Sequence, residues 1–217
     1  MNNWFKPIDI YCERLDAGWW AEPVNALTNL AFVIAGLMIV RHRQHPGPVL
    51  GWLMVTIGIG SFLFHTHANR LTGLIDVTFI GVYLATYAWL WPSIVWHKGT
   101  RTQALSVASL ATFIVLATLL NQVIERAWPE VPPGVYTGAW LYVMTLAVLC
   151  NRRQPVARTW LWITAGLFLG SLTARQLDMP LCPITGGTHW LWHVLNAGVL
   201  YASARAMLAA TKTDATN

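Results

Sequence analysis

The chain reads GTHWLWHVLNAGVLYASARAMLA over residues 187–209, an almost uninterrupted apolar stretch that begins with two histidines. A helix needs about 20 apolar residues to cross the hydrocarbon core of a bilayer, so this stretch is long enough to span one. His189 and His193 are four positions apart, which places them one above the other on the same helix face. The stretch therefore predicts a membrane-crossing helix that presents two imidazoles side by side near one end.

Six further stretches favour the same interpretation, which gives seven predicted helices. The seven predicted helices cover residues 22–41, 48–66, 72–96, 104–124, 134–150, 157–175 and 187–209. The second is the least hydrophobic because it contains Gly58, Gly60 and Ser61. Small residues let neighbouring helices approach closely, so they suit the interior of a bundle. The sequence predicts an all-α integral membrane protein, a bundle of seven transmembrane helices.

The composition favours a chain that is surrounded by lipid. Hydrophobic residues make up 55% of the chain and charged residues only 11%, whereas soluble domains carry about 25% charged residues. The 13 Trp residues also suit a membrane protein, because indole rings favour the membrane–water interface. The net charge is +5, but the basic residues are scattered between apolar segments. We therefore expect the lipid bilayer as a partner and no nucleic acid.

The distribution of basic residues predicts the orientation of the bundle. Of the 14 Lys and Arg residues, nine fall on one side of the predicted membrane and five on the other. The first side holds Arg41, Arg43, Lys98, Arg101, Arg152, Arg153, Arg158, Arg205 and Lys212, and the second holds Lys6, Arg14, Arg70, Arg126 and Arg175. The positive-inside rule assigns the richer side to the cytoplasm, so the N-terminus lies outside and the C-terminus inside.

The connections are short and no linker interrupts the chain. Residues 1–217 are therefore expected to form one domain, with an outer segment at 1–21 and a cytoplasmic tail at 210–217. In a bacterial host this multi-pass protein would lie in the inner membrane, because outer-membrane proteins are usually barrels. The sequence leaves the oligomeric state open.

Four ionisable residues stand out because charges within membrane spans are expensive and usually functional. They are His65, Asp76, His189 and His193. The predicted topology brings all four to a similar depth near the outer face. Three histidines with one open coordination position are typical of a catalytic zinc site, whereas structural sites normally use four protein ligands. We predict that His65, His189 and His193 bind zinc, with the reaction site facing outward.

Ser61 and Asp76 complete the predicted site. Ser61 lies one turn before His65 on the same face, where a hydroxyl could stabilise an oxyanion. Asp76 could accept a proton from zinc-bound water and pass it to the leaving group. Each residue alone has a plainer interpretation: packing for Ser61 and for the histidine pair, and a favourable charge at a helix N-terminus for Asp76.

Two other pairs of residues were considered for the outer side. Three cysteines are too few for a disulfide framework, but Cys12 and Cys182 could form one bridge. Arg175 and Asp178, near the end of the sixth predicted helix, are interpreted as a surface salt bridge, with a role beside the active site as the alternative.

These motifs resemble those of the alkaline ceramidases. The likeness rests on SFLFH at residues 61–65, ID at 75–76 and HWLWH at 189–193. YCE at 11–13 and AE at 21–22, followed by Asn25, resemble two N-terminal elements of the same family. The wider superfamily of seven-helix membrane hydrolases includes the adiponectin-type receptors. The resemblance extends over almost the whole chain.

The resemblance implies an enzyme that hydrolyses linear amide bonds in a membrane lipid. The expected reaction converts ceramide, or another N-acyl lipid, into a sphingoid base and a fatty acid. It implies zinc on His65, His189 and His193, proton transfer by Asp76, stabilisation of the tetrahedral intermediate by Ser61, and a Cys12–Cys182 disulfide. Two alternatives remain open, namely a hydrolase of a lipid ester or phospholipid and a non-enzymatic receptor or scaffold that zinc stabilises.

The family also binds calcium through an acidic N-terminal segment. Glu13 and Glu22 match that pattern, and Asp9 is a further candidate, because carboxylates suit a hard cation. Two positions depart from it. Ile10 stands where the family has an aspartate, and Leu15 stands where it has another oxygen ligand.

Overall fold

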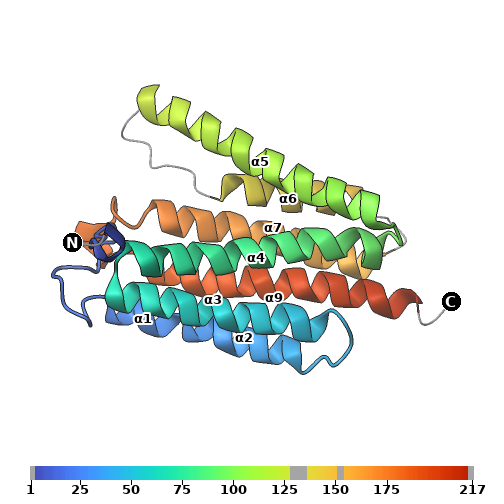
Figure 1. Cartoon of the computed structure of the whole chain (residues 1–217), viewed down its shortest axis with the longest axis horizontal. Helices are drawn as coiled ribbons and strands as arrows, with labels where there is room; N and C mark the ends of the chain where they lie inside the picture. Colours follow the sequence, from blue (N-terminus) through green and yellow to red (C-terminus); the bar gives the residue numbers. More distant parts are fainter. Residues whose placement is uncertain (1–2, 128–135, 151–153, 215–217) are drawn as a thin grey trace.

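A computed structural model of the protein describes residues 3–127, 136–150 and 154–214. Within these ranges the regular elements are helices, apart from one isolated bridge between Pro7 and Asn69. The elements are η1 Asn3–Phe5, α1 Pro23–Thr28, α2 Leu30–Val40, α3 Gly47–His67, α4 Arg70–Val95, α5 Thr100–Ala127, α6 Thr137–Leu149, α7 Pro155–Gln176, α8 Cys182–Thr185 and α9 His189–Asp214. The long helices run along a common direction, with the N-terminus at one end and the C-terminus at the other (Figure 1).

Each of the seven predicted stretches coincides with helical structure, with α1 and α2 sharing the first. Among the described residues, four helical segments are long and apolar enough to cross a membrane, namely Pro23–Val40, Gly47–His67, Arg70–Val95 and Thr100–Ala127. The helix α6 is apolar but shorter. Residues 134–135 of the fifth stretch, Arg152 and Arg153 of the charge count, and the end of the tail at 215–217 lie outside the described residues. The helix α9 continues to Asp214, beyond the predicted start of the tail.

The first predicted helix is divided at Asn29, and local hydrogen bonds account for the break. The Asn29 amide bonds the Ala26 carbonyl three residues back, as in a tighter helical turn. The Asn29 side chain also donates to the Asn25 carbonyl at 2.9 Å, which the hydroxyl of Thr28 contacts at 3.0 Å. Short polar side chains that bond backbone groups in this way compete with regular helix hydrogen bonds. The division at Asn29 follows from this competition, which the apolar pattern alone does not reveal.

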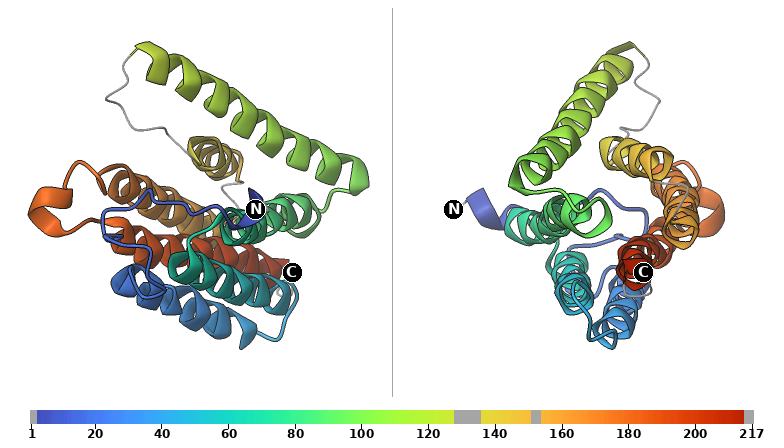
Figure 2. Two further views of the ribbon diagram at one scale, coloured as in Figure 1. Left: turned by 60° about the vertical axis from the view of Figure 1, so that its left-hand side comes forward. Right: turned by 90° about the vertical axis from the view of Figure 1, so that its right-hand side faces the viewer.

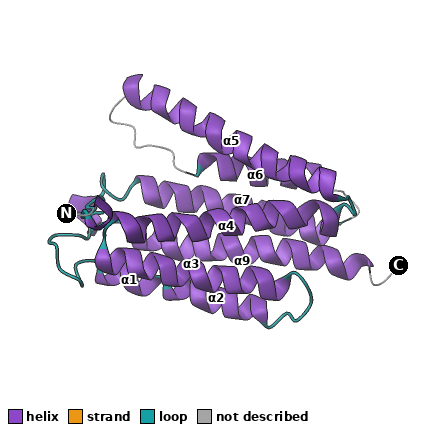
Figure 3. Cartoon of the chain, viewed as in Figure 1, coloured by secondary structure: helices purple, strands orange, loops and turns teal. Residues whose placement is uncertain are grey.

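The helix α9 lies at the centre of the bundle and contacts α1, α2, α3, α4 and α7. By contrast, α5 packs mainly along α4 and α6 and diverges from the other helices (Figures 1 and 2). Figure 3 shows the view of Figure 1 coloured by secondary structure, in which all the long elements are helices. Only Ser106 and Leu110 of α5 are buried, which suits a helix whose apolar surface faces lipid. The two histidines of α9 are therefore carried by the most enclosed helix.

Close contact between α2 and α3 depends on glycine. A Cβ added to Gly51 would lie 2.6 Å from the Gly36 carbonyl oxygen, and one added to Gly36 would lie 2.6 Å from the Gly51 oxygen. Such distances exclude any side chain unless the helices separate. The expectation that small residues let α3 pack closely named other positions, and it is confirmed at one of them, because a Cβ added to Gly58 would lie 3.0 Å from the Asn29 carbonyl oxygen.

Candidate metal centre

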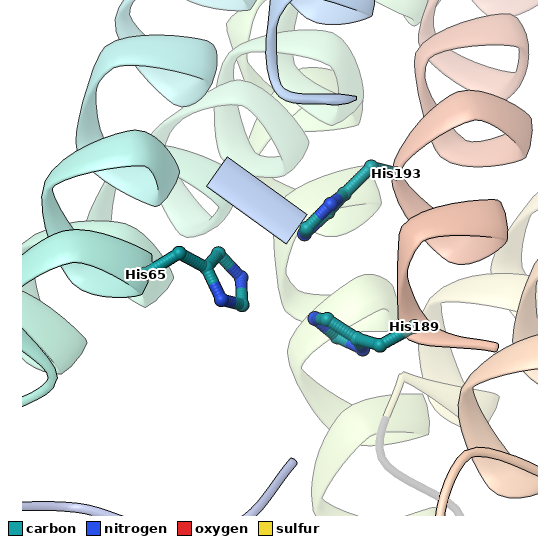
Figure 4. A group of neighbouring side chains, drawn as sticks. All are labelled: His65, His189 and His193. Atoms are coloured by element: carbon teal, nitrogen blue, oxygen red, sulfur yellow. The ribbon is translucent and has the colours of Figure 1, made fainter. Parts of the chain in front are cut away.

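Three histidines meet at the end of the bundle where the N-terminal segment lies. His65 is in the last turn of α3, and His189 and His193 are in the first two turns of α9. One ring nitrogen from each lies within 4.8 Å of the others, and the rings converge on a common point (Figure 4). Their side chains are 0–2% exposed. The three imidazoles that the predicted topology brings together do lie side by side.

Hydrogen bonds at His65 and His193 indicate which nitrogen of these two rings is available to a metal. Glu22 Oε2 lies 2.6 Å from His65 Nδ1, and Thr28 Oγ1 lies 2.9 Å from His193 Nδ1. These contacts leave Nε2 of both rings free to face the centre. Metal-binding histidines usually bond a carboxylate, hydroxyl or carbonyl through their other nitrogen, which sets the tautomer and the ring orientation.

Several polar atoms around the histidines are buried without a hydrogen-bond partner among the described residues. They are Ser61 Oγ, Asp76 Oδ1, His189 Nδ1 and His193 Nε2. An unsatisfied buried polar group destabilises a fold by about 1–3 kcal/mol, so such groups rarely gather by chance. Histidine nitrogens are preferred zinc ligands. The donor set and its orphaned atoms fit a bound metal ion with room for water or a substrate beside it.

A cavity of about 270 Å³ lies beside this centre. Its lining includes Asp76, Tyr11 and Trp192. The rings of Tyr11 and Trp192 stack on His189, with centroids 3.7 Å and 5.2 Å away. Burial raises the pKa of the Tyr11 phenol above its ordinary value, so the hydroxyl stays protonated at neutral pH. The cavity thus extends from Asp76, the predicted proton carrier, to the two aromatic rings that stack on His189.

Asp178 positions His189, the second candidate ligand. Its interpretation as half of a surface salt bridge is wrong, whereas the alternative of a role beside the candidate site agrees with this position. The side chain is 3% exposed. Its Oδ1 accepts hydrogen bonds from the backbone amides of Thr188 at 2.8 Å and His189 at 2.9 Å. These amides have no acceptor within the helix because they lie at the start of α9. Its Oδ2 accepts from the Cys12 amide at 3.0 Å. Asp178 therefore fixes the start of α9 and ties the N-terminal segment to it.

Arg175 lies beside the cavity instead of pairing with Asp178. Its guanidinium donates to the Tyr11 hydroxyl at 3.4 Å and lies 5.9 Å from the ring centroid of Tyr136. Both tyrosines also line the cavity. The alternative that placed Arg175 beside the active site agrees with this arrangement.

The N-terminal segment is fastened over the centre from two directions. Cys12 and Cys182 form the disulfide that the resemblance implies. Backbone hydrogen bonds from Ile8 to Ala68 and from Arg70 to Lys6 hold the segment against the turn between α3 and α4. Tyr11 and its neighbours are thereby held against the histidines, although they are far from them in sequence.

A buried ion pair lies behind His65. The Arg14 side chain contacts Glu22 Oε1 through Nε at 2.5 Å, and both residues are less than a tenth exposed. Asn25 Nδ2 donates to the other carboxylate oxygen at 3.2 Å. Burial raises the pKa of Glu22, but the contacts with His65, Asn25 and Arg14 outweigh it, so the pKa lies below its ordinary value. Glu22 is therefore an anion at neutral pH.

The three residues considered for calcium are not gathered into one group. Asp9 is exposed, and the oxygens of Glu13 accept from the backbone amides of Val24 at 2.6 Å and Asn25 at 2.8 Å, at the start of α1. Glu22 is engaged by Arg14 and His65. In the part of the chain that the structure describes, the three histidines are the only cluster of possible metal ligands. These carboxylates do not fit a calcium site, and the calcium prediction gains no support.

Sequence reasoning missed Thr28, which carried no recognisable motif because its contact with His193 on α9 arises only when distant segments pack. Asp178 was named, but its role beside the site was only the alternative to a surface salt bridge. Glu22 was singled out, but for calcium and not for His65. Nothing in the sequence around Glu22 indicated that its partner is His65, 43 positions away.

The fold and the site together define a class of protein: a helical protein with apolar helices of membrane-spanning length and a buried group of three histidines. The family model described as Ceramidase matches residues 11–216, so the chain belongs to the ceramidase family. Comparisons with curated proteins and with solved structures gave no match.

Proposed function

We propose that this protein is a zinc-dependent intramembrane hydrolase that cleaves the amide bond of ceramide or another N-acyl lipid. The observation that carries the proposal is the convergence of His65, His189 and His193 beside Asp76 and Ser61, in a chain of the ceramidase family. A metal that only joined helices would need no buried carboxylate and hydroxyl beside it. This argument favours an enzyme over a receptor or scaffold.

The histidines would hold zinc through imidazole nitrogens. When bound, zinc lowers the pKa of water and polarises a carbonyl group. Asp76 would take the proton that water loses and deliver it to the amine leaving group. Its unpartnered Oδ1 is suited to this exchange. Ser61 would donate its hydroxyl proton in a hydrogen bond to the oxyanion that develops on the attacked carbonyl.

A membrane-dissolved substrate needs a lateral path to the centre. A cavity of about 360 Å³ lies between α4 and α5 and is lined by Val77, Ile80, Leu84 and other residues. Val77 and Tyr136 also line the cavity beside Asp76, so the two spaces adjoin. α5 diverges from the rest of the bundle on this side of α4 (Figure 2). We propose that the acyl chain lies here, with its amide directed toward the histidines.

The proposed membrane arrangement has seven spans in one domain covering residues 1–217. In it the segment 1–21 and the metal centre lie on the outer side and the C-terminus in the cytoplasm, in the inner membrane for a bacterial host. The clustering of the N-terminal segment, the start of α4 and the start of α9 at one end supports a common side for these elements (Figure 1). The excess of basic residues on the opposite side supports its cytoplasmic assignment.

The proposal is tested by incubating purified protein with ceramides and measuring free fatty acid. The panel also contains matched lipid esters and phospholipids, and His193→Ala serves as the inactive control. Zinc-dependent release from the amide substrates, absent in the variant, supports an amidase. Faster release from esters would reassign the substrate. No turnover of any lipid by zinc-loaded, folded protein would favour the scaffold.

A further inference from the structure

The buried guanidinium of Arg14 occupies a pocket made of oxygen atoms. Besides Glu22 Oε1 at 2.5 Å, it contacts the backbone carbonyls of Asp16 at 3.3 Å, Gly18 at 3.5 Å and His65 at 3.1 Å. The residue is 8% exposed. A carboxylate and several carbonyls around one buried positive charge are also the surroundings that proteins offer to a calcium ion.

The position of this charge links it to the metal centre through two routes. Glu22 holds Arg14 with one carboxylate oxygen and His65 Nδ1 with the other. Arg14 also binds the backbone carbonyl of His65 directly. Both the ring and the backbone of one candidate ligand are thus fixed by the same ion pair. No other described histidine of the centre has a charged partner on its ring.

The surrounding segment offers little to a calcium ion. Ile10 and Leu15 have no side-chain oxygen and are 52% and 90% exposed. Glu13 is turned toward the amides that begin α1. The only buried carboxylate of the group, Glu22, is already neutralised by Arg14. A calcium ion at this place would have to displace the guanidinium.

We propose that Arg14 is a built-in cation that replaces calcium in this chain, and that it positions His65 for metal binding by holding Glu22 in place. Arginine suits this role because its rigid, planar guanidinium donates several hydrogen bonds in fixed directions. A covalently attached cation is also permanently present. The metal centre is then independent of the calcium concentration. The link to catalysis rests on the proposed hydrolase function, but the effect on metal binding does not.

The first test measures calcium directly on the wild-type full-length protein. Elemental analysis after equilibration with millimolar calcium should find no bound calcium. Thermal stability and zinc content should be unchanged by a calcium-selective chelator. One calcium per chain, or a loss of stability on chelation that added calcium restores, would overturn the proposal.

The second test measures zinc affinity by competition with a chelator in Arg14→Gln, Arg14→Lys and Arg126→Gln. Loss of a partner that orients a metal ligand typically lowers affinity about 10–100-fold, and we expect this for Arg14→Gln. Lysine keeps the charge but not the planar donors, so Arg14→Lys should fall between Arg14→Gln and the wild type. Arg126 is exposed on α5 and serves as the matched control with wild-type affinity.

Cobalt substitution separates positioning from general destabilisation. The visible absorption bands of cobalt bound by the histidines should shift in Arg14→Gln and return toward the wild-type spectrum in Arg14→Lys. Wild-type zinc affinity and an unchanged cobalt spectrum in folded Arg14→Gln would refute the positioning role. Because neither readout needs lipid turnover, a failure here is distinguishable from a failure of the proposed hydrolase activity.

Discussion

Two groups of buried polar side chains lie along the same helices but differ in how well they are satisfied. The tyrosine cluster consists of Tyr83 and Tyr87 on α4 and Ser203 on α9. Its hydroxyls bond one another or nearby carbonyls: Tyr83 Oη lies 2.8 Å from Ser203 Oγ and 3.0 Å from the Leu200 oxygen, and Tyr87 Oη lies 3.0 Å from the Ser203 oxygen. At the histidine centre, one or more polar atoms of Ser61, Asp76, His189 and His193 have no partner among the described residues.

The difference separates a structural role from a functional one. Partnered hydroxyls contribute about 0.5–1.5 kcal/mol each to stability, whereas buried unpartnered groups reduce it. Unpartnered buried atoms also occur elsewhere among the described residues, for example Trp91 Nε1 and Ser171 Oγ, but four of them belong to the histidine centre, which favours a ligand there. Removing a polar group should therefore mainly affect stability in the tyrosine cluster and mainly affect activity at the histidine centre.

The largest expected effect is that of Asp76→Asn. The amide keeps the size of the carboxylate but cannot carry the proton, so lipid hydrolysis should fall about 10²–10⁴-fold. Stability should stay the same or rise, because the variant no longer buries an ionisable group. Fatty-acid release and thermal unfolding of the zinc-loaded protein measure the two effects. Activity within a few-fold of wild type would remove Asp76 from the proposed reaction.

A smaller loss is expected for Ser61→Ala. Removing one donor to an oxyanion typically lowers kcat about 10²–10³-fold, while KM should change little because the hydroxyl acts on the developing charge. Ser61 Oγ has no well-formed hydrogen bond and only a weaker interaction with the Asp76 carboxylate, so stability should change little. Steady-state kinetics and an unfolding curve check both statements. A stability loss with normal kcat would return Ser61 to a packing role.

The smallest effect on activity is expected for Tyr83→Phe, the matched variant from the tyrosine cluster. It removes a buried hydroxyl with two partners and should lower the free energy of unfolding by about 0.5–1.5 kcal/mol. Hydrolysis by the folded protein should be unchanged. A kcat reduced as strongly as in Ser61→Ala would contradict the separation between the two groups.

The positions of the helices could be predicted from sequence because long apolar runs indicate membrane-length helices. The three histidines could be predicted as neighbours because alternating helix directions bring the end of α3 and the start of α9 to the same side. Both predictions use only the lengths and order of segments. They need no knowledge of which side chains touch.

The contacts that orient the histidines could not be predicted in the same way. Arg14 and Glu22 reach His65 only because the N-terminal segment folds back over the bundle end. Asp178 appeared exposed beside Arg175 in sequence, yet it binds the amides that begin α9. Such contacts depend on the path of irregular backbone. Hydrophobic periodicity carries no information about that path.

Metal analysis of His193→Ala beside the wild type and Asp76→Asn tests the central claim most directly. Protein purified with zinc supplied should contain one zinc per chain in the wild type and in Asp76→Asn, which keeps all three imidazoles. Folded His193→Ala should lose most of it. A wild-type protein without zinc, or a His193→Ala variant that retains the wild-type amount, would contradict a metal centre formed by His65, His189 and His193.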